Sequence, residues 1–187
     1  MGLYGAIAFI FSFIGFVALP PVIHFHEYSF PEAILEVGGH FAFGAIAALP
    51  FRDFETSFLC GSFAVAIDVD HVLASLNLSF SSRPDHSVAF VLVSMVLMRI
   101  YERRRSSPLT GPEHVSMVWL VPVSVSSHIS YDILAAYNIF PGRGFSFPLF
   151  VPFSYALVPF PFWAWVPLEA SALVLALWAW RRHAKSV

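Results

Sequence analysis

Long apolar runs separated by short polar segments make up most of this sequence. A helix that crosses a membrane needs about 20 mainly apolar residues, and six runs approach that length. We expect these membrane segments at about residues 3–23, 33–51, 54–76, 87–101, 115–137 and 162–180. The pattern therefore predicts an all-α fold, a polytopic transmembrane helix bundle that forms one domain over residues 1–187.

The first run could also be a cleaved signal peptide. It lacks the positively charged start and the small-residue cleavage site that such peptides carry. Residues 3–23 also contain no Asp, Glu, Lys or Arg. We therefore expect a helix that is retained in the membrane.

The composition supports a membrane location. The chain is 58% hydrophobic and 12% charged, whereas a soluble domain carries about a quarter charged residues. Its 21 Phe and five Trp suit lipid-facing surfaces and interfacial belts. The formal net charge of -2 gives no basic surface, so nucleic acid is not an expected partner. Cys60 is the only cysteine, which excludes a disulfide within the chain.

The distribution of Lys and Arg predicts the orientation. Residues 99–105, after the fourth run, and the tail at residues 181–185 are the most basic segments, and such segments favour the cytoplasmic side. We therefore expect both termini in the cytoplasm, and loops 24–32, 77–86 and 138–160 on the external side. The compartment would be the plasma or inner membrane.

Ionisable residues inside membrane segments are costly and usually have a partner or a function. In this chain all of them are Asp or His, the residue types that bind divalent cations. They are His40, Asp68, Asp70, His71, His128 and Asp132, with His86 at the start of the fourth segment. The same residue types could also form a proton relay.

Four of these residues are expected at a common depth. His40, Asp68, His86 and His128 each lie 12–14 residues from a charged or His residue at the expected cytoplasmic boundary. At 1.5 Å per residue, this distance is about 18–21 Å. In a hydrocarbon core about 30 Å thick, the four helices would bring ligands together in the outer leaflet.

Local spacing supports a metal site. Asp68 and His71 are three residues apart, and His128 and Asp132 are four apart, so each pair shares a helix face. Asp70 points elsewhere on an ideal helix; it could reach the site if the helix loosens, or bind a second metal. Such a set would suit a two-metal hydrolytic site.

Each residue also has a simpler interpretation, as a solvated helix end, a hydrogen-bonded buried pair or an interfacial histidine. For Glu36, one turn before His40, a hydrogen bond to that imidazole is possible. Arg83 and Arg143, on the external side, could hold a phosphate or lipid headgroups. Further His residues are expected in a solvated loop or near the membrane surface: His24, His26, His114 and His183.

The order of the motifs resembles the YdjM-like family of membrane-bound metal-dependent hydrolases. The matching elements are Gly39-His40, Asp68-Val69-Asp70-His71, Arg83-Pro84-Asp85-His86-Ser87, His128 with Asp132, and Gly144 followed by Pro152-Phe153-Ser154. The resemblance implies a helical membrane enzyme with a divalent metal, related to zinc-dependent phospholipase C-like hydrolases. Carried over by position, the seven Asp and His residues named above are the implied ligands.

The chain departs from the family pattern at two places. The family element usually has Arg four residues before the His, whereas Arg83 stands three before His86, with Pro84-Asp85 between them. Ile67 stands where the family often has Pro. The role of Arg83 is therefore open, and the family's substrate does not carry over.

We expect a metal-dependent hydrolase that acts on a lipid or lipid-linked phosphoester from the outer leaflet. One or two divalent ions, Zn before Mn or Mg, would activate water, Asp70 could be the general base, and Arg83 could hold phosphate oxygens. The alternative is a metal ion or proton transporter that uses the same cluster, although no internal repeat typical of transporters is visible. A third possibility is a structural subunit whose polar cluster only fixes helix packing. The oligomeric state is left open.

Overall fold

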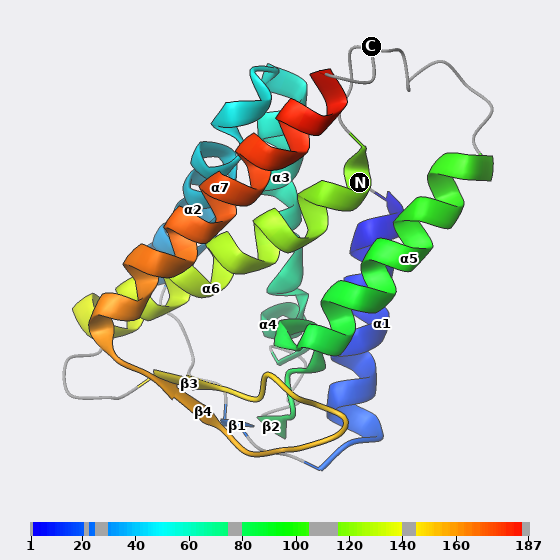
Figure 1. Ribbon diagram of the computed structural model, residues 1–187. Helices are drawn as coiled ribbons and strands as arrows, with labels where there is room; N and C mark the ends of the chain where they lie inside the picture. The colour runs from blue at the N-terminus through cyan, green and yellow to red at the C-terminus, as the bar shows by residue number, and fades with distance from the viewer. Residues whose placement is uncertain are drawn as a thin grey trace.

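The protein is mainly helical, which agrees with the all-α class expected from the sequence. The computed structural model describes residues 2–20, 23–24, 30–74, 80–104, 116–139 and 145–184 (Figure 1). Its helices are α1 (Gly2–Val17), α2 (Phe30–Ala47), α3 (Phe54–Ile67), α4 (Val69–Ala74), α5 (Val88–Arg104), α6 (Leu120–Ile139) and α7 (Trp165–Ala184). Single 3-10 turns precede or follow them: η1 (Leu49–Phe51), η2 (Pro84–His86), η4 (Met117–Trp119) and η5 (Phe162–Ala164).

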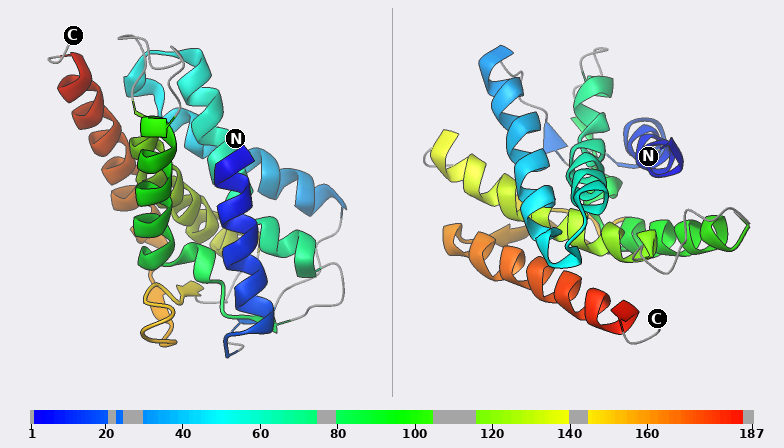
Figure 2. Two further views of the ribbon diagram at one scale, coloured as in Figure 1. Left: turned by 90° about the vertical axis from the view of Figure 1, so that its right-hand side faces the viewer. Right: turned by 90° about the horizontal axis from the view of Figure 1, so that it is seen from above.

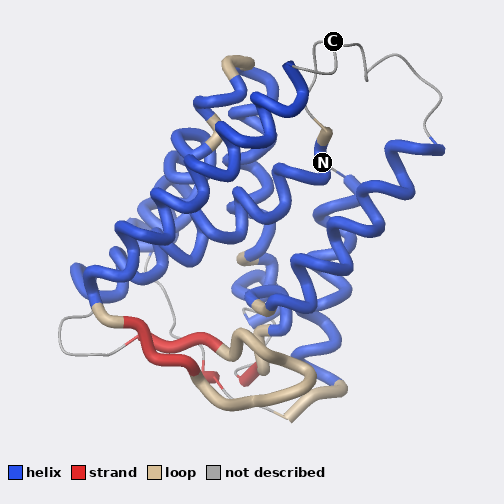
Figure 3. Tube along the Cα trace, viewed as in Figure 1, coloured by secondary structure: helices blue, strands red, loops and turns tan. Residues whose placement is uncertain are grey.

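Two small antiparallel sheets close one end of the helices. β1 (Ile23–His24) pairs with β2 (Phe80–Ser81), and β3 (Phe145–Phe147) pairs with β4 (Val158–Phe160). Figure 3 shows both sheets at the lower end of the molecule, opposite the C-terminal end of α7. These strands fall in or beside the segments expected to be external loops, and the sequence analysis did not predict them.

Among the residues that the structure describes, three helical segments are long and apolar enough to cross a membrane. They are Phe30–Phe51, Met117–Tyr137 and Phe162–Ala184. α1 and α3 are apolar but span only 16 and 14 residues. A membrane location is therefore supported by length and composition, whereas six membrane segments are not confirmed.

The segment expected at residues 54–76 is not one continuous helix. α3 starts behind Asp53, whose carboxylate accepts a hydrogen bond from the Thr56 backbone N–H at 2.8 Å, a common N-cap. It ends before Asp68, and α4 then begins at Val69. At this junction the Asp68 N–H donates to the Val65 carbonyl, a shorter i→i−3 bond that tightens the last turn.

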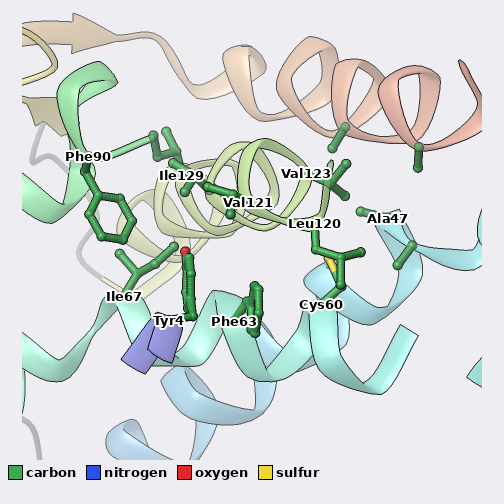
Figure 4. Packing of buried hydrophobic residues seen from close by; sticks show 14 of the residues in the cluster. Tyr4, Ala47, Cys60, Phe63, Ile67, Phe90, Leu120, Val121, Val123 and Ile129 are labelled. Carbon is green, nitrogen blue, oxygen red and sulfur yellow. The ribbon is translucent and has the colours of Figure 1, made fainter. Parts of the chain in front are cut away.

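Helix α6 lies at the centre of the packing. It contacts α2, α3 and α7, and Figure 2, seen from above, shows it between α7 and the α2/α3 pair. The buried apolar side chains form a cluster in which Tyr4 of α1 stacks on Phe63 of α3 with ring centroids 4.0 Å apart (Figure 4). α1 is thereby fixed against the bundle.

Four arginines lie at the end opposite the strands. Arg103 and Arg104 lie in the last turn of α5, and Arg181 and Arg182 in the last turn of α7. Both helices end at the upper side of Figure 1. The side of the membrane that this end faces stays a prediction from the charge distribution.

Candidate metal centre

Side chains from four parts of the fold meet where α3 gives way to α4. α2 contributes His40, the α3/α4 junction Asp68, η2 His86, and α6 both His128 and Asp132. All but Asp68 are buried, and the Asp68 side chain is 14% exposed. With His71, which lies next to Asp68, these five are the residues whose predicted depth or spacing suggested a shared site.

Two of the histidines face each other directly. The Nε2 atoms of His86 and His128 are 2.8 Å apart. Nδ1 of His128 is 2.9 Å from the carbonyl oxygen of Ala64; because a carbonyl only accepts, this nitrogen carries the hydrogen. Nε2 of a neutral His128 therefore presents its lone pair to the centre, which is how a buried hydrogen bond fixes a metal-binding imidazole.

His86 is fixed in the same way by a carboxylate. Its Nδ1 lies 2.8 Å from Oδ1 of Asp85, and Asp85 also accepts a hydrogen bond from the Ser12 hydroxyl of α1. With Nδ1–H bound to Asp85, Nε2 of a neutral His86 also presents a lone pair toward His128. A metal ion bound by both nitrogens would satisfy the two lone pairs, and so would a proton on one Nε2, which makes the contact an N–H···N hydrogen bond.

Two carboxylates complete this centre. Oδ2 of Asp132 lies 3.3 Å from Nε2 of His128 and 3.7 Å from Nε2 of His86, and Oδ1 of Asp68 lies 3.6 Å from Nε2 of His128. The Asp132 oxygen is buried and makes no hydrogen bond with the described residues. A buried acceptor without a hydrogen bond is costly, and binding to a cation would remove that cost.

His40 reaches the centre from α2. Its Nε2 lies 2.9 Å from Oδ2 of Asp68 and 3.2 Å from Oδ1 of Asp132, and its ring stacks on His128 at 4.0 Å. The carboxylate of Glu36 approaches this same Nε2 at 3.4 Å. Glu36 thus stands at the edge of the centre and faces the same imidazole nitrogen as the two Asp residues.

The break at Asp68 brings a second group of charges to the site. Nε of Arg83 donates to Oδ2 of Asp70 at 2.6 Å, and Nη2 donates to Oδ1 of Asp68 at 3.1 Å. Arg83 itself has a positive φ of 42°, a backbone region that is costly for a residue with a side chain. The predicted role of Asp70 required an interruption of the helix beside it. The break between α3 and α4 is that interruption. The phosphate-binding role of Arg83 stays a prediction.

Asp85 is the residue that the sequence analysis missed. It appeared only as a departure from the family motif, although an Asp directly before a candidate metal-binding His is a usable signal. Asp85 and His86 lie in η2, outside the three candidate membrane spans. Burial raises the pKa of Asp85, but His86, Arg83 and Ser12 together lower it below its ordinary value. Burial and Arg83 lower the pKa of His86, but Asp85 and Asp132 raise it to about 9.

The cluster holds more carboxyl side chains than arginines. One arginine, Arg83, stands beside four carboxyl groups, those of Asp68, Asp70, Asp85 and Asp132. Without a metal, a protonated His86, with its raised pKa of about 9, supplies a further positive charge. Histidines that bind a metal are neutral. Buried charge needs opposite charge, so the described cluster has the composition of a cation site.

Four overlapping groups within the cluster could each hold a metal ion, with their donor atoms within 4.8 Å of one another. They are His40/His128/Asp132, Asp68/His86/His128, Asp68/Asp70/His71 and Asp70/Asp85/His86. Every predicted ligand belongs to one of them. His71 is the most exposed member, at 26% of its side chain. Because Asp68 and His128 are shared, the geometry suits either one ion or two neighbouring ions.

Some predicted candidates cannot be placed. His26, His114 and Arg143 lie outside the described residues, as does the side chain of His24, of which β1 gives only the backbone. His183 lies in the last turn of α7 and belongs to none of the four groups. Ser87 caps α5 by accepting a hydrogen bond from the Phe90 N–H.

Comparison with models of protein families, with curated proteins and with solved structures finds no match. The resemblance to the YdjM-like family therefore stays a prediction from its short motifs. The geometry of the cluster is independent of that resemblance.

Proposed function

We propose that this protein is a membrane-embedded, metal-dependent hydrolase that acts on a lipid or lipid-linked phosphoester. The observation that carries the proposal is the pair of imidazole Nε2 atoms of His86 and His128, 2.8 Å apart. Each ring is held by its other nitrogen, and carboxylates of Asp68 and Asp132 surround the pair. The same contact could be an N–H···N hydrogen bond between two structural histidines, and elemental analysis for metal separates the two cases.

The donor set favours zinc, in one or two ions, because imidazole and carboxylate ligands together are typical of zinc enzymes. Mn²⁺ or Mg²⁺ would be favoured if the carboxylates dominate binding. When bound, such an ion activates water and polarises a phosphoryl oxygen. That chemistry is the basis for proposing hydrolysis.

The surrounding residues can supply the other roles. Asp70 is fully buried, and its Oδ1 makes no hydrogen bond with the described residues; it is the proposed proton acceptor. Arg83 holds Asp70 and Asp68 in place through its Nε and Nη2 atoms. A substrate phosphate would have to share this guanidinium with the two carboxylates.

A lipid substrate is proposed because of where the cluster lies. It joins three apolar helices, two of which contain candidate membrane spans. The α4 segment that follows Asp68 lies in the half of the molecule nearer the strands, away from the basic helix ends (Figure 1). This placement supports a site toward the external face.

The direct test uses the purified full chain reconstituted with phospholipids and supplied with Zn²⁺, Mn²⁺ or Mg²⁺. We expect stoichiometric metal by elemental analysis and release of a headgroup or diacylglycerol product. His128→Ala should lose both, whereas the control His183→Ala should keep both. A protein that binds metal but turns over no lipid class with any of these ions would contradict the proposal.

One observation favours the alternative of a metal or proton transporter. The helix break at Asp68 places a ligand between two half-helices, as in many transporters. Uptake of metal into proteoliposomes that is abolished by Asp132→Asn, without lipid turnover, would support that function.

A further inference from the structure

An open groove runs between α2 and α3. Its volume is about 560 Å³, within the range of ligand pockets in proteins. Its lining includes Val37, Gly38 and Phe41 of α2 and Phe58, Ser62 and Val65 of α3.

The groove is lined by apolar groups. No Asp, Glu, Lys, Arg or His belongs to its lining. Its one hydroxyl, on Ser62, donates to the carbonyl oxygen of Phe58 at 2.8 Å and is thus already satisfied. Val37 and Phe58 are each about half exposed. The groove therefore offers a hydrocarbon surface and no charged recognition.

The groove adjoins the candidate metal centre on both helices. Gly38 stands two residues before His40, and Ala66, also in the lining, two before Asp68. Two residues correspond to about 3 Å along a helix axis. His40 and Asp68 are themselves in contact, with Nε2 and Oδ2 2.9 Å apart. The groove and the metal ligands therefore lie at the same level along both helices, on different helix faces, because positions two apart do not face each other.

Glycines set the separation of the two helices. A Cβ added to Gly61 would lie 2.6 Å from the Phe41 carbonyl oxygen, and one added to Gly44 would lie 2.8 Å from the Cys60 carbonyl oxygen. The backbones are therefore in close contact at these positions. A Cβ added to Gly38 would meet nothing within 4 Å, so the space beside Gly38 is free of protein atoms.

Building on the proposed function, we propose that this groove holds an acyl chain of the lipid substrate. α2 belongs to a candidate membrane span, so the groove would open sideways into the hydrocarbon of the bilayer. An acyl chain matches the uncharged lining, and its headgroup ester would then reach the level of His40 and Asp68 at the edge between α2 and α3. The substrate class is thereby narrowed to lipids with a hydrocarbon tail that enters between α2 and α3.

Gly38→Leu tests the proposal by filling the groove. The change removes no contact, and Leu has a better helix propensity than Gly. Gly5→Leu is the matched control, because a Cβ on Gly5 of α1 also meets nothing within 4 Å. The probe is phosphatidylglycerol with a diazirine on one acyl chain, in nanodiscs that contain the full chain. Labelled peptides are then quantified by mass spectrometry.

In the wild type, we expect more label on the peptides of the groove than on the exposed face of α1 around Phe9 and Phe13. Gly38→Leu should reduce the groove label by about tenfold, because the leucine displaces several buried CH2 groups of the tail. Gly5→Leu should leave the groove label unchanged. Equal labelling of both faces, or no response to Gly38→Leu, would overturn the proposal. Cross-links between two protein chains through the groove would also overturn it, in favour of a second copy as the occupant.

Elemental analysis of the same samples separates this proposal from the proposed function. Stoichiometric metal together with equal labelling of the groove and of α1 would overturn only the proposal that the groove holds an acyl chain. Groove labelling that depends on Gly38, in a protein without bound metal, would keep the lipid groove and overturn the hydrolase.

Discussion

Helices α3 and α6 are in contact along two regions with opposite chemistry. Toward their N-terminal ends they meet through apolar side chains, including Cys60, Phe63, Leu120 and Val121 (Figure 4). Toward their C-terminal ends they approach Asp68, which directly follows α3, and His128 and Asp132 of α6. The first region is close-packed core, whereas the second gathers charged and polar atoms.

The two regions differ in what stabilises them. The apolar region needs only complementary shape, because lipid tails are as apolar as the side chains. The polar region brings carboxylates together and leaves buried oxygens of Asp70 and Asp132 without hydrogen bonds among the described residues. The comparison teaches that the apolar region can fold by packing alone, whereas the polar region gathers carboxylates that a bound cation would stabilise.

The largest expected effect on stability is in the apolar region. Phe63 is fully buried and stacks on Tyr4. Phe63→Ala should lower the free energy of unfolding by about 3 kcal/mol, the low end for such changes, because its cavity loses packing contacts within an apolar environment. Unfolding in mixed micelles measures this change. The control Phe54→Ala, at a side chain that is 84% exposed, should have little effect, and metal content should be unchanged in both variants.

Metal removal should destabilise the protein through the polar region. Its effect on the free energy of unfolding should be slightly smaller than that of Phe63→Ala. A ligand that binds only the folded protein stabilises it by about 2.7 kcal/mol at 100 times its Kd. We therefore expect a chelator to lower the Tm of the wild type and of Phe54→Ala, and to leave Asp132→Asn unchanged. Identical chelator responses in wild type and Asp132→Asn would contradict a metal role for this residue.

The sequence predicted the helices better than their interruptions. Apolar runs located most helices, because length and hydropathy are local properties. The expected segment at residues 3–23 ends early, at Val17, shortly before Pro20 and Pro21; proline disfavours helix at the preceding residue. The break at Asp68 could not be predicted from an ideal helix, since the residues on either side of it, Asp68 and Asp70, bind Arg83 from another segment.

The same distinction holds for the site. Asp and His residues in apolar runs were recognisable because they are costly there. The role of Asp85 was not recognisable, because its partner Ser12 stands 73 positions away in the sequence. Glu36 was correctly noted beside His40, but the nitrogen that it faces could be known only from the packing of α2 on α6.

Asp85→Asn should have an intermediate effect on metal binding. The carboxylate orients His86 and makes its imidazole more basic, and loss of such a partner typically weakens metal binding about 10- to 100-fold, or about 1.4–2.7 kcal/mol. Titration with a competing metal chelator measures this change. The control Asp53→Asn alters a similar hydrogen-bonded carboxylate at the start of α3 and should leave affinity unchanged. Equal affinities in wild type and Asp85→Asn would show that His86 is oriented without this carboxylate.

Glu36→Gln should have the smallest effect on metal affinity. The variant tests whether Glu36 marks the edge of the polar region. Its carboxylate is 12% exposed and lies 3.4 Å from Nε2 of His40, farther than the carboxylates of Asp68 and Asp132. Partly exposed ion pairs contribute about 0.2–1 kcal/mol, so metal affinity should fall by less than about fivefold. The same chelator titration measures it, with Glu55→Gln as a control outside the cluster. A loss as large as that of Asp132→Asn would instead make Glu36 a metal ligand, because only direct coordination gives an effect of that size at a side chain on the edge of the cluster.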